Sequence, residues 1–193
     1  MSALANVAKP MTVEEFLVWE GPFDARWELV EGQPIAMAPA KRTHNAIQAE
    51  LTGLIRDALL ERGSPCSVLT TPGVVPRVRS KVNFRVPDIG VVCGDYEEEQ
   101  LYVPEPIVLI EVLSPGNESK TRSNIWTYTT LPSVKEIAVF LTDKIGAELL
   151  RRGADGNWPE TPEMIEAGDV VFESLGVFFP LEAAYRTTRL KGP

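Results

Sequence analysis

The chain has 193 residues, of which 44% are hydrophobic and 24% charged, a balance typical of a folded, soluble protein and not of a disordered one. Its longest apolar runs have the length of strands, well short of the roughly 20 residues that a membrane-spanning helix needs. The formal net charge of −8 opposes non-specific attraction to nucleic acid.

The domain organisation is predicted to be simple, because a chain of this length can bury one substantial core. We expect a flexible N-terminal arm over residues 1–11 and one domain over residues 12–193. The arm lacks the basic start and long apolar centre of a signal peptide. The chain has two cysteines, Cys66 and Cys93, and the second ends an expected core strand. A disulfide framework is therefore not expected. The expected location is the reducing environment of the cytoplasm.

The first part of the chain contains signals for two helices and a hairpin. Thr12 and Glu15 have the spacing of a capping box, which predicts a short helix after them. Alternating apolar residues before and after residues 31–32 predict a hairpin that turns there. Apolar residues then recur at helical spacing, which predicts a longer helix from Thr43, as its N-cap, to Gly63.

The rest of the chain is predicted to form a sheet. A helix is expected over residues 119–130. It should end there because the residue before the proline at position 132 disfavours helical geometry. Strands are expected at residues 66–70, 82–86, 89–93, 107–113, 135–141 and 147–151, with short apolar pieces at 170–172 and 177–179 and a helical turn at 181–185. This order implies an α/β (α+β) fold, a mixed β-sheet flanked by helices.

Two carboxylates, Asp88 and Glu111, stand beside or within apolar runs that are typical of buried strands. An unpaired carboxylate in a dry interior costs several kcal/mol, so Glu111 should be paired, hydrogen-bonded or bound to a metal. Hard oxygen ligands on neighbouring strands suit Mg²⁺ or Mn²⁺. These two residues are therefore candidate metal ligands.

Two further polar residues are ambiguous when considered alone. Alternation along its strand would place Glu28 toward solvent. His44, the single histidine, would usually be a surface or packing residue at the first turn of a helix. The chain has no Gly-rich phosphate loop, no zinc-type Cys/His spacing and no G-x-S-x-G motif, so P-loop, zinc and serine hydrolase chemistries are disfavoured.

Several segments form a recognisable pattern when they are taken together. They are Trp27-Glu28-Leu29-Val30-Glu31-Gly32, Met37-Ala38-Pro39, His44 at the head of a helix, Val86-Pro87-Asp88-Ile89, Glu111-Val112-Leu113-Ser114-Pro115, and the stretch from Tyr128 to Glu136. In order and spacing they resemble the Uma2 family, also called DUF820, over about residues 12–142. That family belongs to the PD-(D/E)XK nuclease superfamily, so the resemblance implies a restriction-endonuclease-like core.

The resemblance also implies roles for single residues. Asp88 and Glu111 resemble the first and second acidic residues of the motif, both metal ligands, and the Val112 carbonyl would be a further ligand. Glu28 resembles the acidic residue that the first core helix of the superfamily often supplies, although here it falls on a predicted strand. His44 matches a histidine that recurs in the family and is expected at the mouth of the site.

The chain departs from the motif at its lysine, which normally lies two residues after the second acid and stabilises charge on the phosphate. Leu113 occupies that position here. Many family members supply a lysine from the following helix, but that lysine would fall near Asn124 or Ile125 in this chain. Lys120, about one helical turn earlier, is the nearest substitute, and Arg122 is the second.

These expectations combine into one function and one alternative. The expected function is a Mg²⁺- or Mn²⁺-dependent endonuclease that hydrolyses phosphodiester bonds of nucleic acid, DNA more than RNA, with Glu28, Asp88, Glu111 and Lys120 as catalytic residues. By resemblance the protein would be a homodimer or higher homo-oligomer. The replaced lysine and the acidic charge favour the alternative, a catalytically degenerate module that binds nucleic acid or a protein partner.

Overall fold

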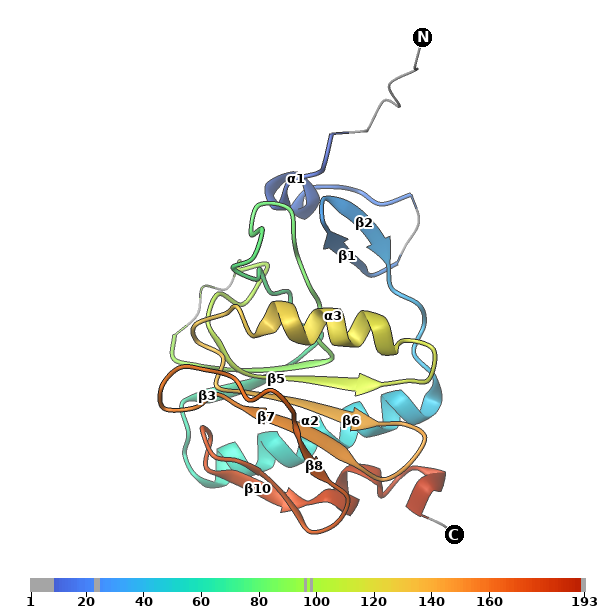
Figure 1. Cartoon of the computed structure of the whole chain (residues 1–193), viewed down its shortest axis with the longest axis vertical. Coiled ribbons are helices and arrows are strands. Elements are labelled where there is room, and N and C mark those ends of the chain that lie inside the picture. The colour runs from blue at the N-terminus through green and yellow to red at the C-terminus, as the bar shows by residue number, and fades with distance from the viewer. Residues whose placement is uncertain (1–8, 23–24, 96, 98, 192–193) are drawn as a thin grey trace.

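The computed structural model describes residues 9–22, 25–95, 97 and 99–191, and it shows helices on both faces of a β-sheet (Figure 1). The elements in chain order are α1 (Val13–Leu17), β1 (Trp27–Val30), β2 (Gln33–Ala36), α2 (Arg42–Glu61), β3 (Cys66–Thr70), β4 (Ile89–Cys93), β5 (Pro106–Leu113), α3 (Glu118–Tyr128), β6 (Glu136–Leu141), β7 (Ala147–Arg151), β8 (Glu163–Ile165), β9 (Asp169–Phe172), β10 (Val177–Pro180) and the 3₁₀ helices η1 (Leu181–Tyr185) and η2 (Arg189–Lys191). No helix in the described ranges is both long and apolar enough to cross a membrane.

The largest sheet of the described chain has six strands in the order β3-β4-β5-β6-β7-β8. β5 and β6 are parallel, and the other neighbours are antiparallel. A parallel pair needs a long crossover, and α3 supplies it between β5 and β6. The predicted mixed sheet flanked by helices is therefore confirmed.

β5 is apolar along its length because both of its faces are covered by helices. Val108, Ile110 and Val112 belong to the core that includes the buried face of α2. The alternate residue Leu109 belongs to a second core, which includes residues of α3. The same alternation turns Glu111 toward α3, where it accepts a hydrogen bond from that helix. The carboxylate thus lies on the α3 side of the sheet.

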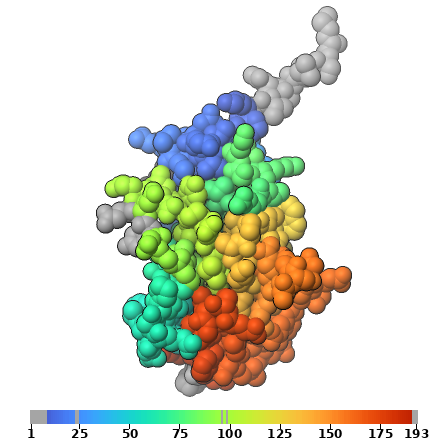
Figure 2. Space-filling model, turned by 90° about the vertical axis from the view of Figure 1, so that its left-hand side faces the viewer, coloured from blue at the N-terminus to red at the C-terminus, as the bar shows by residue number. Residues whose placement is uncertain are grey.

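The N-terminal elements form a smaller unit above the sheet. The predicted capping box is present, with Thr12 accepting from the Glu15 amide and Glu15 reaching back to the Thr12 amide. β1 and β2 form the predicted hairpin. An isolated β-bridge between Leu29 and Phe84 links this unit to the rest of the chain, and the two residues share a small core with Val13. Further hydrogen bonds join the unit to residues 81–86. Figure 2 shows the unit (blue) beside the green segment that contains Phe84, at the end of the molecule opposite the red C-terminal part.

Several predicted boundaries change in the structure. The strand predicted at residues 82–86 is wrong, because only isolated bridges form there, at Phe84 and Arg85. The short strand β8 was not predicted. α2 begins two residues earlier than expected, with Lys41 and not Thr43 as its N-cap. Of the expected N-terminal arm, residues 1–8 lie outside the described residues, and the Met11 amide donates to the Gly32 carbonyl.

The expectation that the two cysteines stay unpaired is wrong. Cys66 and Cys93 form a disulfide between β3 and β4. The antiparallel register places the two residues directly opposite each other, which their separation along the chain did not reveal. A cytoplasmic location therefore loses the support that it drew from unpaired cysteines, and it stays a prediction.

Candidate functional site

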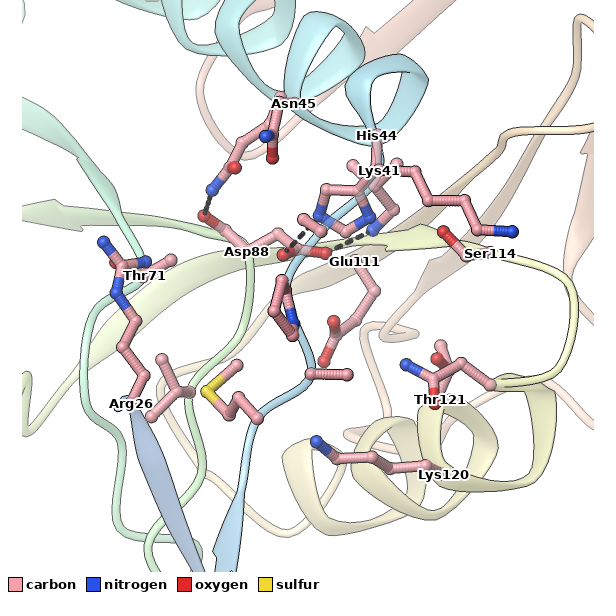
Figure 3. Close-up of a pocket in the computed structure, with 18 of the residues that line it drawn as sticks. Arg26, Lys41, His44, Asn45, Thr71, Asp88, Glu111, Ser114, Lys120 and Thr121 are labelled. Atoms are coloured by element: carbon pink, nitrogen blue, oxygen red, sulfur yellow. Dashed lines mark hydrogen bonds and ion pairs between the residues drawn. The ribbon is translucent and has the colours of Figure 1, made fainter. Parts of the chain in front are cut away.

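A pocket of about 730 Å³ lies where the end of β5, the first turns of α2 and α3, and the β1–β2 unit meet (Figure 3). Glu28, Asp88, Glu111 and Lys120 line it together with His44. These residues come from separate parts of the sequence, and the fold gathers them in one place. The pocket is therefore the candidate functional site.

Asp88 and Glu111 are neighbours because of the pairing between β4 and β5. Ile89 lies opposite Ile110 in this antiparallel pair, so the next positions outward are Asp88 and Glu111. The Val112 amide donates a 2.7 Å hydrogen bond to Asp88 Oδ2. Within a strand, the N–H and C=O of one residue point toward the same neighbouring strand. The Val112 carbonyl therefore faces the side on which Asp88 lies.

α2 holds Asp88 in position from above. His44 Nε2 lies 2.9 Å from Asp88 Oδ1, and both side chains are largely buried, with exposed fractions of 13% and 12%. Gln48, one helical turn further along, donates a 2.7 Å hydrogen bond from Nε2 to the Asp88 carbonyl oxygen. Both carboxylate oxygens and the main chain of Asp88 are thus fixed by hydrogen bonds.

Glu111 has weaker partners. Tyr128 donates its hydroxyl to Glu111 Oε1 at 2.7 Å, and Asn124 donates its amide to the same oxygen at 3.3 Å. Burial, followed by the nearby Asp88 carboxylate, raises the pKa of Glu111 well above its ordinary value. Burial and then Glu111 likewise raise the pKa of Tyr128, so its hydroxyl stays protonated and keeps donating. A cation bound beside Glu111 would stabilise its charged form, which burial and Asp88 disfavour.

Glu28 is fully buried, so the solvent-facing position that alternation alone favours is wrong. It does lie on a strand, as the sequence pattern indicated, and not on a helix. Lys120 Nζ lies 2.7 Å from Glu28 Oε2, and the Val86 amide donates to Oε1 at 3.1 Å. Asn124 also donates to Oε1, at 3.4 Å. The Asn124 amide therefore bridges Glu28 and Glu111.

One face of α3 supplies the helical part of the site. Lys120, Asn124 and Tyr128 are spaced four residues apart, which places them on the same side of a helix. Tyr128 is a site residue that the sequence motifs do not indicate, and this spacing is the signal from which it could be found. Arg122 leaves this face and pairs with Glu148, and it is not among the residues that line the pocket.

The donors in this pocket suit a small hard cation. Asp88, Glu111 and the Val112 carbonyl offer only oxygen, which Mg²⁺ and Mn²⁺ prefer. Within the described residues, no group of three His, Cys, Asp or Glu side chains is arranged to hold a metal ion. Glu28 is instead engaged by Lys120. Two carboxylates, one carbonyl and water would complete the shell, as Mg²⁺ usually keeps several waters.

Comparisons with known proteins give a consistent result. The model of the family described as "Uma2: Putative restriction endonuclease" matches residues 13–178. A crystal structure from Anabaena variabilis, described as a "putative nuclease belonging to DUF820", has a TM-score of 0.74 and 18% sequence identity to the chain. The alignment covers 92% of this chain and 98% of that one. At this identity the likeness establishes the fold. None of the curated proteins matches the chain.

Proposed function

Because the chain belongs to the Uma2 family of restriction-endonuclease-like proteins, we propose that it is a metal-dependent endonuclease that hydrolyses phosphodiester bonds of nucleic acid, DNA in the first instance. The observation that carries this proposal is that Asp88 and Glu111 lie side by side in the pocket, where β4 begins and its antiparallel neighbour β5 ends. The Glu111 carboxylate has only neutral side-chain donors, and its pKa is raised, as expected of a buried acid without a cation beside it.

Asp88, Glu111 and the Val112 carbonyl would hold Mg²⁺ or Mn²⁺. When bound, such a cation supplies Lewis acidity toward a phosphate oxygen and lowers the pKa of a bound water. His44 and the Val112 amide keep the Asp88 carboxylate in one orientation. Tyr128 does the same for Glu111.

Lys120 is our candidate for the cation that stabilises charge on the scissile phosphate. It enters the pocket from the first turn of α3, and about a third of its side chain is exposed. Its partner Glu28 is completely buried, so the ion pair holds the ammonium group at the pocket wall. Leu113, at the position of the missing motif lysine, packs against the core on the α3 side and can supply no charge. We therefore assign to Lys120 the role of offsetting negative charge in the transition state.

A second function is favoured by the same departure from the motif. A protein that keeps the fold and has lost catalysis could bind nucleic acid or a protein partner through this pocket. Asp88 supports this alternative, since both of its carboxylate oxygens already have hydrogen-bond partners within the protein.

A cleavage assay separates the two functions. Purified protein is incubated with single- and double-stranded DNA and RNA, with Mg²⁺ or Mn²⁺ and with or without excess chelator. The nuclease proposal expects cleavage that chelator stops and that Asp88→Asn removes. If wild-type protein cleaves none of these substrates in either metal, but still binds one of them or a protein, the alternative is correct.

A further inference from the structure

Two exposed cations, Arg26 and Lys41, lie at the rim of the pocket and take no part in the carboxylate cluster. Arg26 precedes β1, and its guanidinium donates to the Thr71 hydroxyl at 2.9 Å. Lys41 precedes α2, and its side chain makes no capping hydrogen bond to that helix. In Figure 3 the two charged groups lie on opposite sides of Asp88 and Glu111.

Arg26 and Lys41 combine two features, a place in the lining of the pocket and the lack of an acidic partner within the described residues. Some exposed cations elsewhere are neutralised by a nearby carboxylate, as in the pairs Lys9–Glu15, Arg56–Asp57, Arg79–Glu31, Lys144–Glu166 and Arg186–Glu50. Others, such as Lys81 and Lys135, have no carboxylate partner among the described residues, but they do not line the pocket. Within the described residues, no carboxylate pairs with Arg26 or Lys41. Unpaired positive charge at a pocket rim is available to an anionic ligand.

The charge of the pocket agrees with an anionic ligand. Three acidic side chains line it, Glu28, Asp88 and Glu111, against three basic ones, Arg26, Lys41 and Lys120. The charges cancel when all six are ionised, and one divalent cation would leave a net charge of +2. The whole chain carries a net charge of −8, which repels a phosphate. With the cation bound, the pocket would be a locally positive region that attracts one.

We propose that Arg26 and Lys41 bind the phosphates on either side of the scissile one, so that one strand of nucleic acid crosses the pocket from Arg26 to Lys41 through its phosphodiester backbone. This inference rests on the proposed nuclease function. Phosphate contacts position a strand without reading its sequence. No Phe, Tyr or Trp lines the pocket within the described residues, so the aromatic faces on which bases stack are not offered there.

The test measures binding of a labelled single-stranded oligonucleotide, as DNA and as RNA, over a range of salt concentrations. Glu111→Gln is the background, so that binding is observed without cleavage. Added Arg26→Ala or Lys41→Ala should each lower the slope of log K against log salt by about 0.7. Each should also weaken binding about three- to fivefold near 0.1 M salt. Arg26→Lys and Lys41→Arg should restore both quantities, because they keep the charge.

Lys135→Ala is the matched control. Lys135 is exposed, and its amide donates to the Ile107 carbonyl at the beginning of β5, whereas the pocket lies at the end of that strand. This variant should leave the slope unchanged. Two results overturn the inference. One is a change in slope that is as large in Lys135→Ala as in Lys41→Ala. The other is an unchanged slope in Arg26→Ala or in Lys41→Ala. Wild-type cleavage measured in parallel tests the nuclease function separately, since cleavage without any change in slope refutes only the proposed strand path.

Discussion

Two buried glutamates lie on the neighbouring parallel strands β5 and β6, and their surroundings differ. Glu136, on β6, is 2% exposed and accepts hydrogen bonds from the Glu173 amide, the Ser174 amide and the Ser174 hydroxyl at 3.0, 3.0 and 2.5 Å. Arg151 adds a charged partner at 3.1 Å. The charge of Glu136 is thus satisfied within the fold, and it ties β6 to the C-terminal hairpin.

Glu111, on β5, is 7% exposed but has only neutral donors, Tyr128 and Asn124, and it lies beside a second carboxylate, Asp88. Its raised pKa is the electrostatic consequence of burial without a cation. The comparison shows that burial of an acid is not by itself a sign of function. What distinguishes a candidate metal ligand is a buried acid that lacks a compensating positive charge.

The largest difference between the two glutamates should appear in activity. Glu111→Gln should abolish metal-dependent cleavage, because an amide is a poor ligand for a hard cation. Glu136→Gln should retain activity and instead lower the free energy of unfolding by about 1.5–3 kcal/mol, as a charged hydrogen-bond acceptor is lost. Cleavage rates and denaturant unfolding of both variants check this. Equal loss of activity in two well-folded variants would contradict the distinction.

The two candidate cations of α3 offer a second comparison. Lys120→Ala should slow cleavage on the order of 10²–10³-fold, because it removes charge stabilisation from the transition state. Arg122→Ala should leave the cleavage rate within a few-fold, since Arg122 pairs with Glu148 away from the pocket. Single-turnover rates at saturating metal separate these outcomes. The assignment of Lys120 fails if the order of the two effects is reversed.

Metal binding should distinguish the site from the Glu136 cluster without any substrate. Mn²⁺ at 100 times its Kd should stabilise wild-type protein by about 2.7 kcal/mol, which for this length corresponds to roughly 5–11 °C in Tm. Glu136→Gln should show the same metal-induced shift. Asp88→Ala should show a much smaller one. A shift in Asp88→Ala as large as in wild type, measured by thermal denaturation, would remove Asp88 from the ligand set.

The smallest effect concerns pH in the presence of chelator. The pKa of Glu111 is raised in the folded state from its ordinary value of 4.5. The folded protein therefore binds more protons than the unfolded chain between these two pKa values, and its stability should fall as pH rises through that interval. Glu111→Gln removes this loss of stability, so at pH 8 the variant should have a higher Tm than wild type. Each kcal/mol of unfolding free energy that wild type loses to this pH effect corresponds to about 2–4 °C in Tm. The two Tm values should converge near pH 4, and a difference independent of pH would contradict this account.

Local sequence patterns were sufficient for most of the fold. The continuous apolar run of β5 predicted a strand covered on both faces, and the structure places α2 and α3 there. The capping box at Thr12 and the turn at residues 31–32 depend on neighbours a few positions away, so they could be recognised directly. The strand expected at residues 82–86 failed, because strand pairing depends on a partner that local propensity does not specify.

The sequence by itself identified Asp88 and Glu111 as the two central acids of the candidate site, since carboxylates beside or within apolar strands are anomalous whatever surrounds them. Only the tertiary structure decided which residues accompany them. It buried Glu28 and paired it with Lys120, turned Arg122 away, and joined Cys66 to Cys93. These outcomes depend on contacts between residues far apart in the chain, and the physical reason is that burial and pairing are properties of the packed fold and not of local sequence.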